Sequence, residues 1–150
     1  LLQAMTHIPK NLSVQYLAKH QHALLTKLYR SHASRMRITP QADVWVVRNP
    51  ALIAGLCLSP VAHGYWLTSL FTAPQYRQQG VASLLVEKAL LNYPNSPIWL
   101  FCNPKLQTFY HTLGFLETQD LPEQLSDRLA RYQQHKNLIA MQNTEPRKQR

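Results

Sequence analysis

The sequence predicts an α/β (α+β) domain built on a mixed, mostly antiparallel central sheet that is flanked by helices. Three observations predict it. Residues 42–58 hold two β-prone runs separated by Asn49-Pro50, which is typical of a hairpin. Residues 65–92 have the pattern of a strand, a short turn and a helix in succession. Residues 98–102 are wholly apolar, as expected for a strand covered on both faces. Hairpins followed by strand–helix units favour a mixed sheet.

Length and composition fit one globular domain. The chain has 150 residues, of which 45% are hydrophobic, and this is enough to bury a core. We expect the domain to span residues 1–143 and the basic tail at 144–150 to be disordered. No apolar run reaches membrane-spanning length, and no signal segment stands at the start. We therefore expect a cytoplasmic protein without a membrane partner.

Sixteen Lys and Arg against seven Asp and Glu give a net charge of +9. Such a charge favours an anionic partner through long-range attraction. The basic residues are spread along the chain, and only residues 147–150 form a dense run. We therefore do not expect nucleic acid as the partner, although a basic binding module stays an alternative. The sequence leaves open whether the protein is a homodimer.

The N-terminal part is predicted to start with a short strand at residues 1–8. A helix is predicted over residues 11–32, capped by Asn11, with an apolar face formed by Val14, Leu17, Leu24 and Leu28. His20 and His22 lie two residues apart, so they point to different sides of a helix and we expect no metal site there.

The central segment follows the hairpin. Pro74 ends its strand, because proline cannot donate to a sheet ladder. The helix that follows has an apolar face of Val81, Leu84, Leu85 and Ala89 and stops at residues 93–97. Asn103-Pro104 then opens another helix, which Gly114 ends, and a strand starts at residues 115–117.

The C-terminal part is predicted as a helix over residues 121–135 and a last strand over 138–141. Asp120 and Glu123 have the spacing of a capping box for this helix. Cys57 and Cys102 lie in apolar runs, so we expect buried thiols and neither a disulfide nor a metal pair.

The turn before the central helix reads Arg77-Gln78-Gln79-Gly80-Val81-Ala82. A helix start leaves backbone N–H groups unpaired, and Gly80 would let a phosphate approach them closely. The segment lacks the features of a Walker loop or a dinucleotide fingerprint. It resembles the coenzyme A loop of the GNAT superfamily of N-acetyltransferases, in which Arg or Gln, two residues, Gly, one residue and Gly or Ala follow a strand.

A second segment strengthens the resemblance. Asn103-Pro104, Phe109-Tyr110 and Leu113-Gly114-Phe115 resemble the other stretch that this family shares, with matching distances between them. The resemblance covers about residues 11–142 and is closest to small, single-domain bacterial members. It implies acetyl-CoA as the donor, direct attack by an amine on the thioester, and no metal.

The resemblance also implies which residues hold the donor. Leu70, in an expected bulge, and Thr72 would offer backbone amides to the pantetheine arm and the acetyl carbonyl. The full set of implied donor-binding residues is Leu70, Phe71, Thr72, Arg77, Gln78, Gln79, Gly80, Val81, Ala82, Ser83 and Asn103.

Tyr110 matches the family's general acid. A phenol, with a pKa near 10, can donate a proton to a departing thiolate whose thiol has a pKa near 8.5. The alternative is a core tyrosine packed beside its aromatic neighbours.

The general base is less clear. Many members carry a carboxylate on the central strand, where this chain has Thr68 and Ser69. His63 and Tyr65 are the candidates that remain, and a water relay or an amine that arrives neutral would also serve. We do not expect Cys102 to act as a nucleophile, since no His or acidic residue lies near it in the sequence at a spacing that would let it activate the thiol.

We therefore expect an N-acetyltransferase that acts on a primary amine of a small molecule. The positive net charge disfavours a polyamine as the acceptor. The alternatives are an acetyltransferase for protein N-termini or lysines, and a non-catalytic module that binds nucleic acid or protein.

Overall fold

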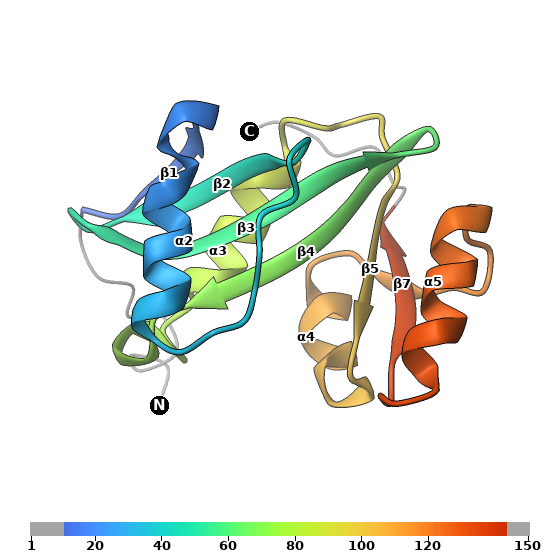
Figure 1. The fold of residues 1–150 in the computed structure, drawn as a ribbon. Helices are drawn as coiled ribbons and strands as arrows, with labels where there is room; N and C mark the ends of the chain where they lie inside the picture. Colours follow the sequence, from blue (N-terminus) through green and yellow to red (C-terminus); the bar gives the residue numbers. More distant parts are fainter. Residues whose placement is uncertain (1–10, 144–150) are drawn as a thin grey trace.

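The computed structural model describes residues 11–143, which form a central sheet with helices on both of its faces (Figure 1). The predicted strand at residues 1–8 and the basic tail at 144–150 lie outside the described residues. Over the part that is described, no helix is both long and apolar enough to span a membrane.

The strands of this region are β1 (Ser13–Leu17), β2 (Asp43–Arg48), β3 (Leu52–Val61), β4 (Gly64–Thr72), β5 (Ile98–Cys102), β6 (Leu116–Glu117) and β7 (Ile139–Asn143). The helices are α2 (His22–Ser31), α3 (Val81–Leu90), α4 (Gln107–Thr112) and α5 (Glu123–Gln133), with single 3₁₀ turns η1 (Lys19–Gln21), η2 (Pro74–Tyr76) and η3 (Pro104–Leu106). The strands form one seven-stranded sheet in the order β1-β2-β3-β4-β5-β7-β6.

The sheet confirms the predicted fold class. Its neighbouring strands are antiparallel except for β4 and β5, which run parallel. The predicted hairpin is β2–β3, and the predicted strand–turn–helix segment is β4 followed by η2 and α3. The helix opened by Asn103-Pro104 is η3 and α4, and Gly114 follows it with φ +94°, the left-handed conformation expected of a helix-ending glycine.

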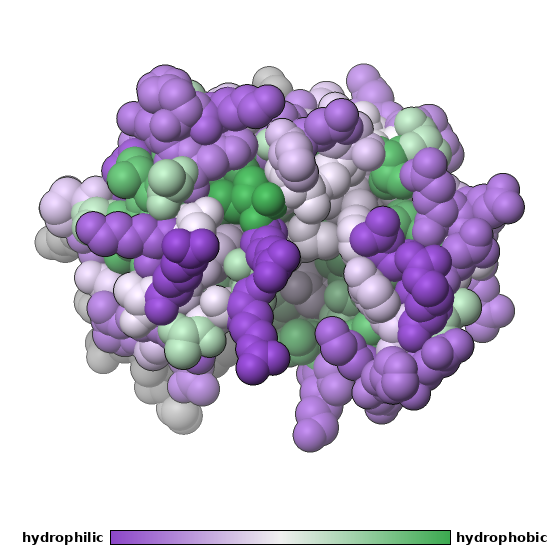
Figure 2. All heavy atoms as spheres, in the orientation of Figure 1, coloured by the Kyte–Doolittle hydropathy of each residue, from purple (hydrophilic) through white to green (hydrophobic). Residues whose placement is uncertain are grey.

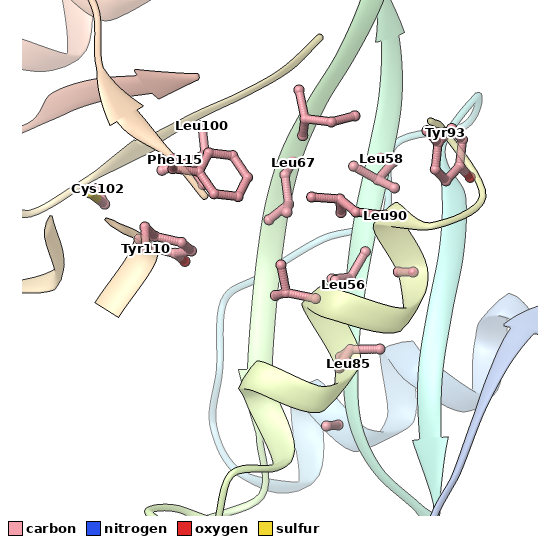
Figure 3. Packing of buried hydrophobic residues seen from close by; sticks show 14 of the residues in the cluster. Leu56, Leu58, Leu67, Leu85, Leu90, Tyr93, Leu100, Cys102, Tyr110 and Phe115 are labelled. Carbon is pink, nitrogen blue, oxygen red and sulfur yellow. The ribbon is translucent and has the colours of Figure 1, made fainter. Parts of the chain in front are cut away.

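Side chains of the sheet pack against helices on both faces. One cluster lies between the sheet and α3 and includes Leu56, Leu67 and Leu85, as Figure 3 shows. The other lies between the sheet and α2 and includes Leu25, Tyr29 and Phe71. Successive strand residues point to opposite faces, so a strand between two helical layers has apolar residues at consecutive positions.

The predicted helix over residues 11–32 is wrong in its first part. Residues 13–17 form β1, which pairs antiparallel with β2 from Ser13–Arg48 to Leu17–Val44, and the α-helix begins only at His22. Asn11 does not cap a helix but adopts φ +67° before the strand. The apolar spacing of this segment suits both the helical period of 3.6 residues and the strand period of two. The segment becomes a strand because it can pair with the open edge of β2.

The predicted capping box is also wrong. The α5 helix begins at Glu123 after Pro122, and no side chain caps it. Pro122 disfavours helical backbone at the residue before it, so a helix cannot include Leu121. The Pro122 carbonyl accepts the first helical bonds, from the Leu125 and Ser126 amides at 2.9 Å each.

Gly64 offers a test of the junction between β4 and β5. The Tyr65 amide donates to the Pro97 carbonyl at 3.0 Å, and a Cβ on Gly64 would meet this carbonyl oxygen and the Trp99 ring. Gly64→Ala should therefore lower the free energy of unfolding by about 1–3 kcal/mol, the usual cost of overpacking. Urea denaturation would measure the change.

Ala62→Gly, in the turn just before Gly64, serves as the control because it replaces alanine with glycine. Ala62 has φ +49°, a conformation that glycine adopts without strain. Ala62→Gly should leave stability unchanged or raise it, and equal losses in both variants would contradict the steric explanation.

Candidate active site

The site is organised around the place where β4 and β5 separate. These parallel neighbours pair only at Tyr65 with Ile98 and at Trp66 with Trp99. Beyond these pairs the two strands diverge, as the green and yellow arrows of Figure 1 show. The facing edges of the diverging strands therefore carry backbone groups that have no ladder partner, and an extended ligand can pair with such groups.

A bulge lies in β4 along the diverging part. Gly55 pairs with Phe71 and Cys57 pairs with Thr68, so two residues of β4, Ser69 and Leu70, stand opposite one residue of β3. The predicted bulge at Leu70 is thus confirmed. A bulge leaves an extra residue outside the ladder and bends its strand.

Two hydrogen bonds hold the bulge. The Tyr29 hydroxyl on α2 donates to the Ser69 carbonyl at 2.7 Å, and the Ser69 hydroxyl donates to the Arg37 carbonyl at 2.9 Å. Ser69 itself has φ +59°, which is strained for a residue with a side chain. These contacts fix a conformation that an isolated strand would not keep.

The turn between β4 and α3 presents backbone amides. Gln78 has φ +62° and Gly80 has φ +81°, and residue 80 is the N-cap of α3. Within residues 11–143, the first backbone bond into α3 is donated by Leu84 to Gly80 at 3.0 Å, and the amides from Gln78 to Ser83 donate to no backbone carbonyl. Amides gathered at a helix start form a concave site that suits an anion.

The other predicted donor residues lie on both sides of this turn. Arg77 folds back on β4: its Nε donates to the Thr72 carbonyl at 2.8 Å, and its guanidinium lies 5.3 Å from the centre of the Phe71 ring. The side chains of Phe71 and Val81 are buried in the core, so both residues can offer only backbone groups to a ligand.

Tyr110 lies on α4, which follows β5. Its ring is 7% exposed and contacts Phe109 at 4.9 Å and Phe115 at 5.8 Å between ring centres. Figure 3 shows its hydroxyl oxygen on the side that faces β4 and α3. Burial, together with a smaller contribution from the nearby Cys102 thiol, raises the pKa of the Tyr110 phenol to about 12. The phenol is therefore protonated at neutral pH.

A family model described as the acetyltransferase (GNAT) domain matches residues 40–117, a little more than half of the chain. This chain belongs to the GNAT family of acetyltransferases. The match covers β2 to β6 and thus the strand separation, the bulge, the amide turn and Tyr110. A search of the curated proteins finds no match.

Several solved structures share the fold of this chain at low sequence identity. Escherichia coli ElaA has a TM-score of 0.64 at 17% identity, over 88% of this chain and 99% of its own. The ribosomal-protein-S18-alanine N-acetyltransferase from Escherichia coli has a TM-score of 0.60 at 15% identity, and the match covers 93% of this chain and 96% of its own. N-acetylglutamate synthase from Neisseria gonorrhoeae has a TM-score of 0.65 at 13% identity, and the match covers 94% of this chain and 36% of its own. That structure is a complex with coenzyme A and N-acetyl-glutamate.

Asn103 of this GNAT enzyme caps the turn that leads to α4. Its side-chain oxygen accepts from the Lys105 amide at 3.0 Å, and Asn103 itself is exposed at the end of β5. The side-chain amide N–H₂ group is thus still available to a ligand between the strands.

The two candidate bases lie at the closed end of the strand separation. His63 is exposed in the β3–β4 turn and contacts the Trp99 ring at 5.3 Å, while Tyr65 contacts the Tyr93 ring at 4.7 Å. At about 3.3 Å per residue along a strand, His63 is roughly 20 Å from the bulge at Ser69. The structure does not bring His63 to the bulge.

Sequence reasoning missed a groove of about 480 Å³ on the face of β4 that is turned away from α3. It runs over Trp66, Thr68 and Ser69, and between the segment that follows α2 and the α5 helix. The α5 side contributes Arg128, Tyr132 and Lys136. Arg128 and Tyr132 lie four residues apart on one face of α5, and Lys136 follows the end of the helix. The spacing of Arg128 and Tyr132 is the only signal of this groove in the sequence.

The structure also bears on the remaining predicted chemistry. Within residues 11–143 no three His, Cys, Asp or Glu side chains come together as a metal site. Cys57 and Cys102 are both buried, as predicted, and the Cys102 thiol donates to the Met141 sulfur at 3.7 Å.

Substitutions at Gly80 test the amide turn. Gly80→Val would place a branched side chain over the amides, so acetyl-CoA affinity in a calorimetric titration should fall roughly 10-fold or more. Valine is also strained at φ +81°, whereas asparagine tolerates such backbone.

Gly80→Asn is therefore the matched variant. It should keep the melting temperature of the ligand-free protein near wild type and still weaken acetyl-CoA. If both variants bound acetyl-CoA with wild-type affinity, the donor phosphates would have to bind at another part of the surface.

Proposed function

We propose that this enzyme transfers an acetyl group from acetyl-CoA directly to a primary amine of a small molecule. One observation carries the proposal: the bulged strand β4 separates from β5 opposite a buried, protonated Tyr110. A thioester between the strands would then have backbone amides on one side and a proton donor on the other. Membership of the GNAT family supports an acyl-CoA donor.

The donor would bind along the strand separation. The amides from Gln78 to Ser83 and the positive end of α3 suit the diphosphate. The pantetheine arm, which carries its own amide groups, would pair with the free edge of β4 as an additional strand would. The coenzyme A bound to the Neisseria gonorrhoeae synthase supports this class of donor for the shared fold.

The reaction needs one new bond and one broken bond. The lone pair of the amine nitrogen attacks the thioester carbonyl carbon, and negative charge develops on the carbonyl oxygen. Backbone amides at the bulge, among them that of Leu70, would stabilise this oxygen. The carbon–sulfur bond then breaks, the thiolate takes the proton of Tyr110, and the attacking nitrogen loses a proton to water. Water returns a proton to Tyr110, so the products are an amide and free coenzyme A.

Water is the proposed acceptor of the amine proton. The strand position where many GNAT enzymes have a carboxylate holds Thr68 and Ser69, and no His, Asp or Glu lines the groove. An amine that arrives neutral needs no strong base, because its proton becomes acidic once the nitrogen has attacked. His63 stays a candidate only if a chain of waters spans its distance from the bulge.

The proton donor can be tested with Tyr110→Phe, which keeps the ring and removes the hydroxyl. Turnover at saturating acetyl-CoA should fall by ~10²–10⁴-fold, the range typical of general acids. Acetyl-CoA affinity and melting temperature should change little, because in the described region the hydroxyl makes no hydrogen bond. Steady-state release of coenzyme A would measure turnover.

Tyr16→Phe is a matched control, since Tyr16 is 52% exposed and packs on Trp45 at the far edge of the sheet.

The pH dependence of turnover offers a second test. Burial favours the neutral form of the Tyr110 phenol, so loss of its proton should not reduce wild-type turnover between about pH 7 and pH 10. Equal turnover in Tyr110→Phe and wild type would reduce Tyr110 to a packing residue.

A further inference from the structure

The groove on β4 adjoins the place where the proposed reaction occurs. Ser69 belongs both to the bulge and to the groove lining. The groove is open on the α2 and α5 side of the sheet, whereas the amide turn leads into α3 on the other side (Figure 1). A donor on the α3 side and an acceptor in the groove can therefore meet between β4 and β5.

Positive charge surrounds this groove. Its lining contains Arg35, Arg37, Arg128 and Lys136 and no acidic residue. None of these four side chains has an ion-pair or hydrogen-bond partner in the described region, although the chain has seven Asp and Glu in total. Unpaired cations around a concave surface raise the local concentration of anions and repel cations.

Aromatic rings hold two of these cations in place. The Arg128 guanidinium lies 4.9 Å from the centre of the Trp66 ring, and the Lys136 ammonium lies 5.6 Å from that of Tyr132. A guanidinium that stacks on a ring keeps its edge N–H groups free, and these groups match the two oxygens of a carboxylate.

The rings also make the floor of the groove apolar. Phe101 on β5 contacts Trp66 at 5.4 Å and Tyr132 at 6.3 Å between ring centres. Figure 2 shows this face of the molecule, where a hollow near the middle lies between strongly hydrophilic groups on both sides. The groove therefore combines an apolar floor with a cationic margin.

We propose that the acceptor is an amine that carries a carboxylate, with an amino acid as the simplest case. This inference rests on the proposed function and adds the substrate class. The amine would reach the bulge, the carboxylate would pair with the cations of the margin, and the apolar part would lie on the aromatic floor. A cationic margin also repels polyamines, whose charge nothing would balance.

The test compares amines that differ only in the carboxylate. Initial rates of coenzyme A release would be measured on the full chain for each free amino acid and its amide, and for tryptamine and spermidine. We expect kcat/KM for the best amino acid to exceed that of its amide by roughly 10–100-fold, as expected when one charged hydrogen-bonded pair is lost. Mass spectrometry would confirm the acetylated product.

Groove variants assign the preference to these residues. Arg128→Gln and Arg35→Gln should each raise KM for the amino acid by roughly 10-fold while kcat and the rate with the amide change little. Arg128→Lys keeps the charge but loses the planar guanidinium, so its KM for the amino acid should lie between those of wild type and Arg128→Gln. Arg131→Gln is the matched control, because Arg131 is exposed on α5 and does not line the groove.

Separate outcomes test the inference and the function on which it rests. If acetyl-CoA does not raise the melting temperature and no amine is acetylated, the proposed function is wrong and this inference falls with it. If acetyl-CoA binds but amides, tryptamine or spermidine react as well as amino acids, only the carboxylate preference is wrong. Acetylation of peptide amines without any free amino acid would overturn it as well.

Discussion

The bulge in β4 is the constraint on which the rest of the site depends. Leu67 and Leu70 are three residues apart, yet both pack on the α3 side of the sheet, while Phe71 packs on the α2 side. Strand alternation allows this only with one extra residue, which the Tyr29 hydroxyl holds in place through the Ser69 carbonyl. The helix α2 thus shapes the strand edge at which the thioester would lie.

The single parallel pair in the sheet has a related effect. An antiparallel neighbour can follow a strand through a tight turn, whereas a parallel neighbour needs a crossover, and here α3 is that crossover. The same helix therefore closes one face of β4 and supplies the amide turn at its start. The other face stays open, because α2 and α5 lie at its two sides and the groove runs between them.

Local patterns in the sequence were enough for the parts of the site that are contiguous in the chain. The runs around Pro74, Gly80 and Gly114 predicted β4, α3 and α4, because proline and glycine restrict the backbone in known ways. The first strand was missed, because residues 13–17 fit a helical pattern until β2 offers them an edge. The groove was missed for a different reason: Arg37, Trp66 and Arg128 are distant in the chain, and only the sheet order brings them together.

The two cysteines have a practical consequence for work with this enzyme. Cys57 is fully buried and Cys102 is 5% exposed. Burial raises the pKa of the Cys57 thiol to about 11 and also raises that of Cys102, to which the Glu117 charge adds. Aromatic disulfide reagents react with exposed thiolates, and the folded protein has almost none of these within residues 11–143. Such a reagent can therefore report free coenzyme A in the presence of the native enzyme with little background, and an increase in that background would itself signal unfolding.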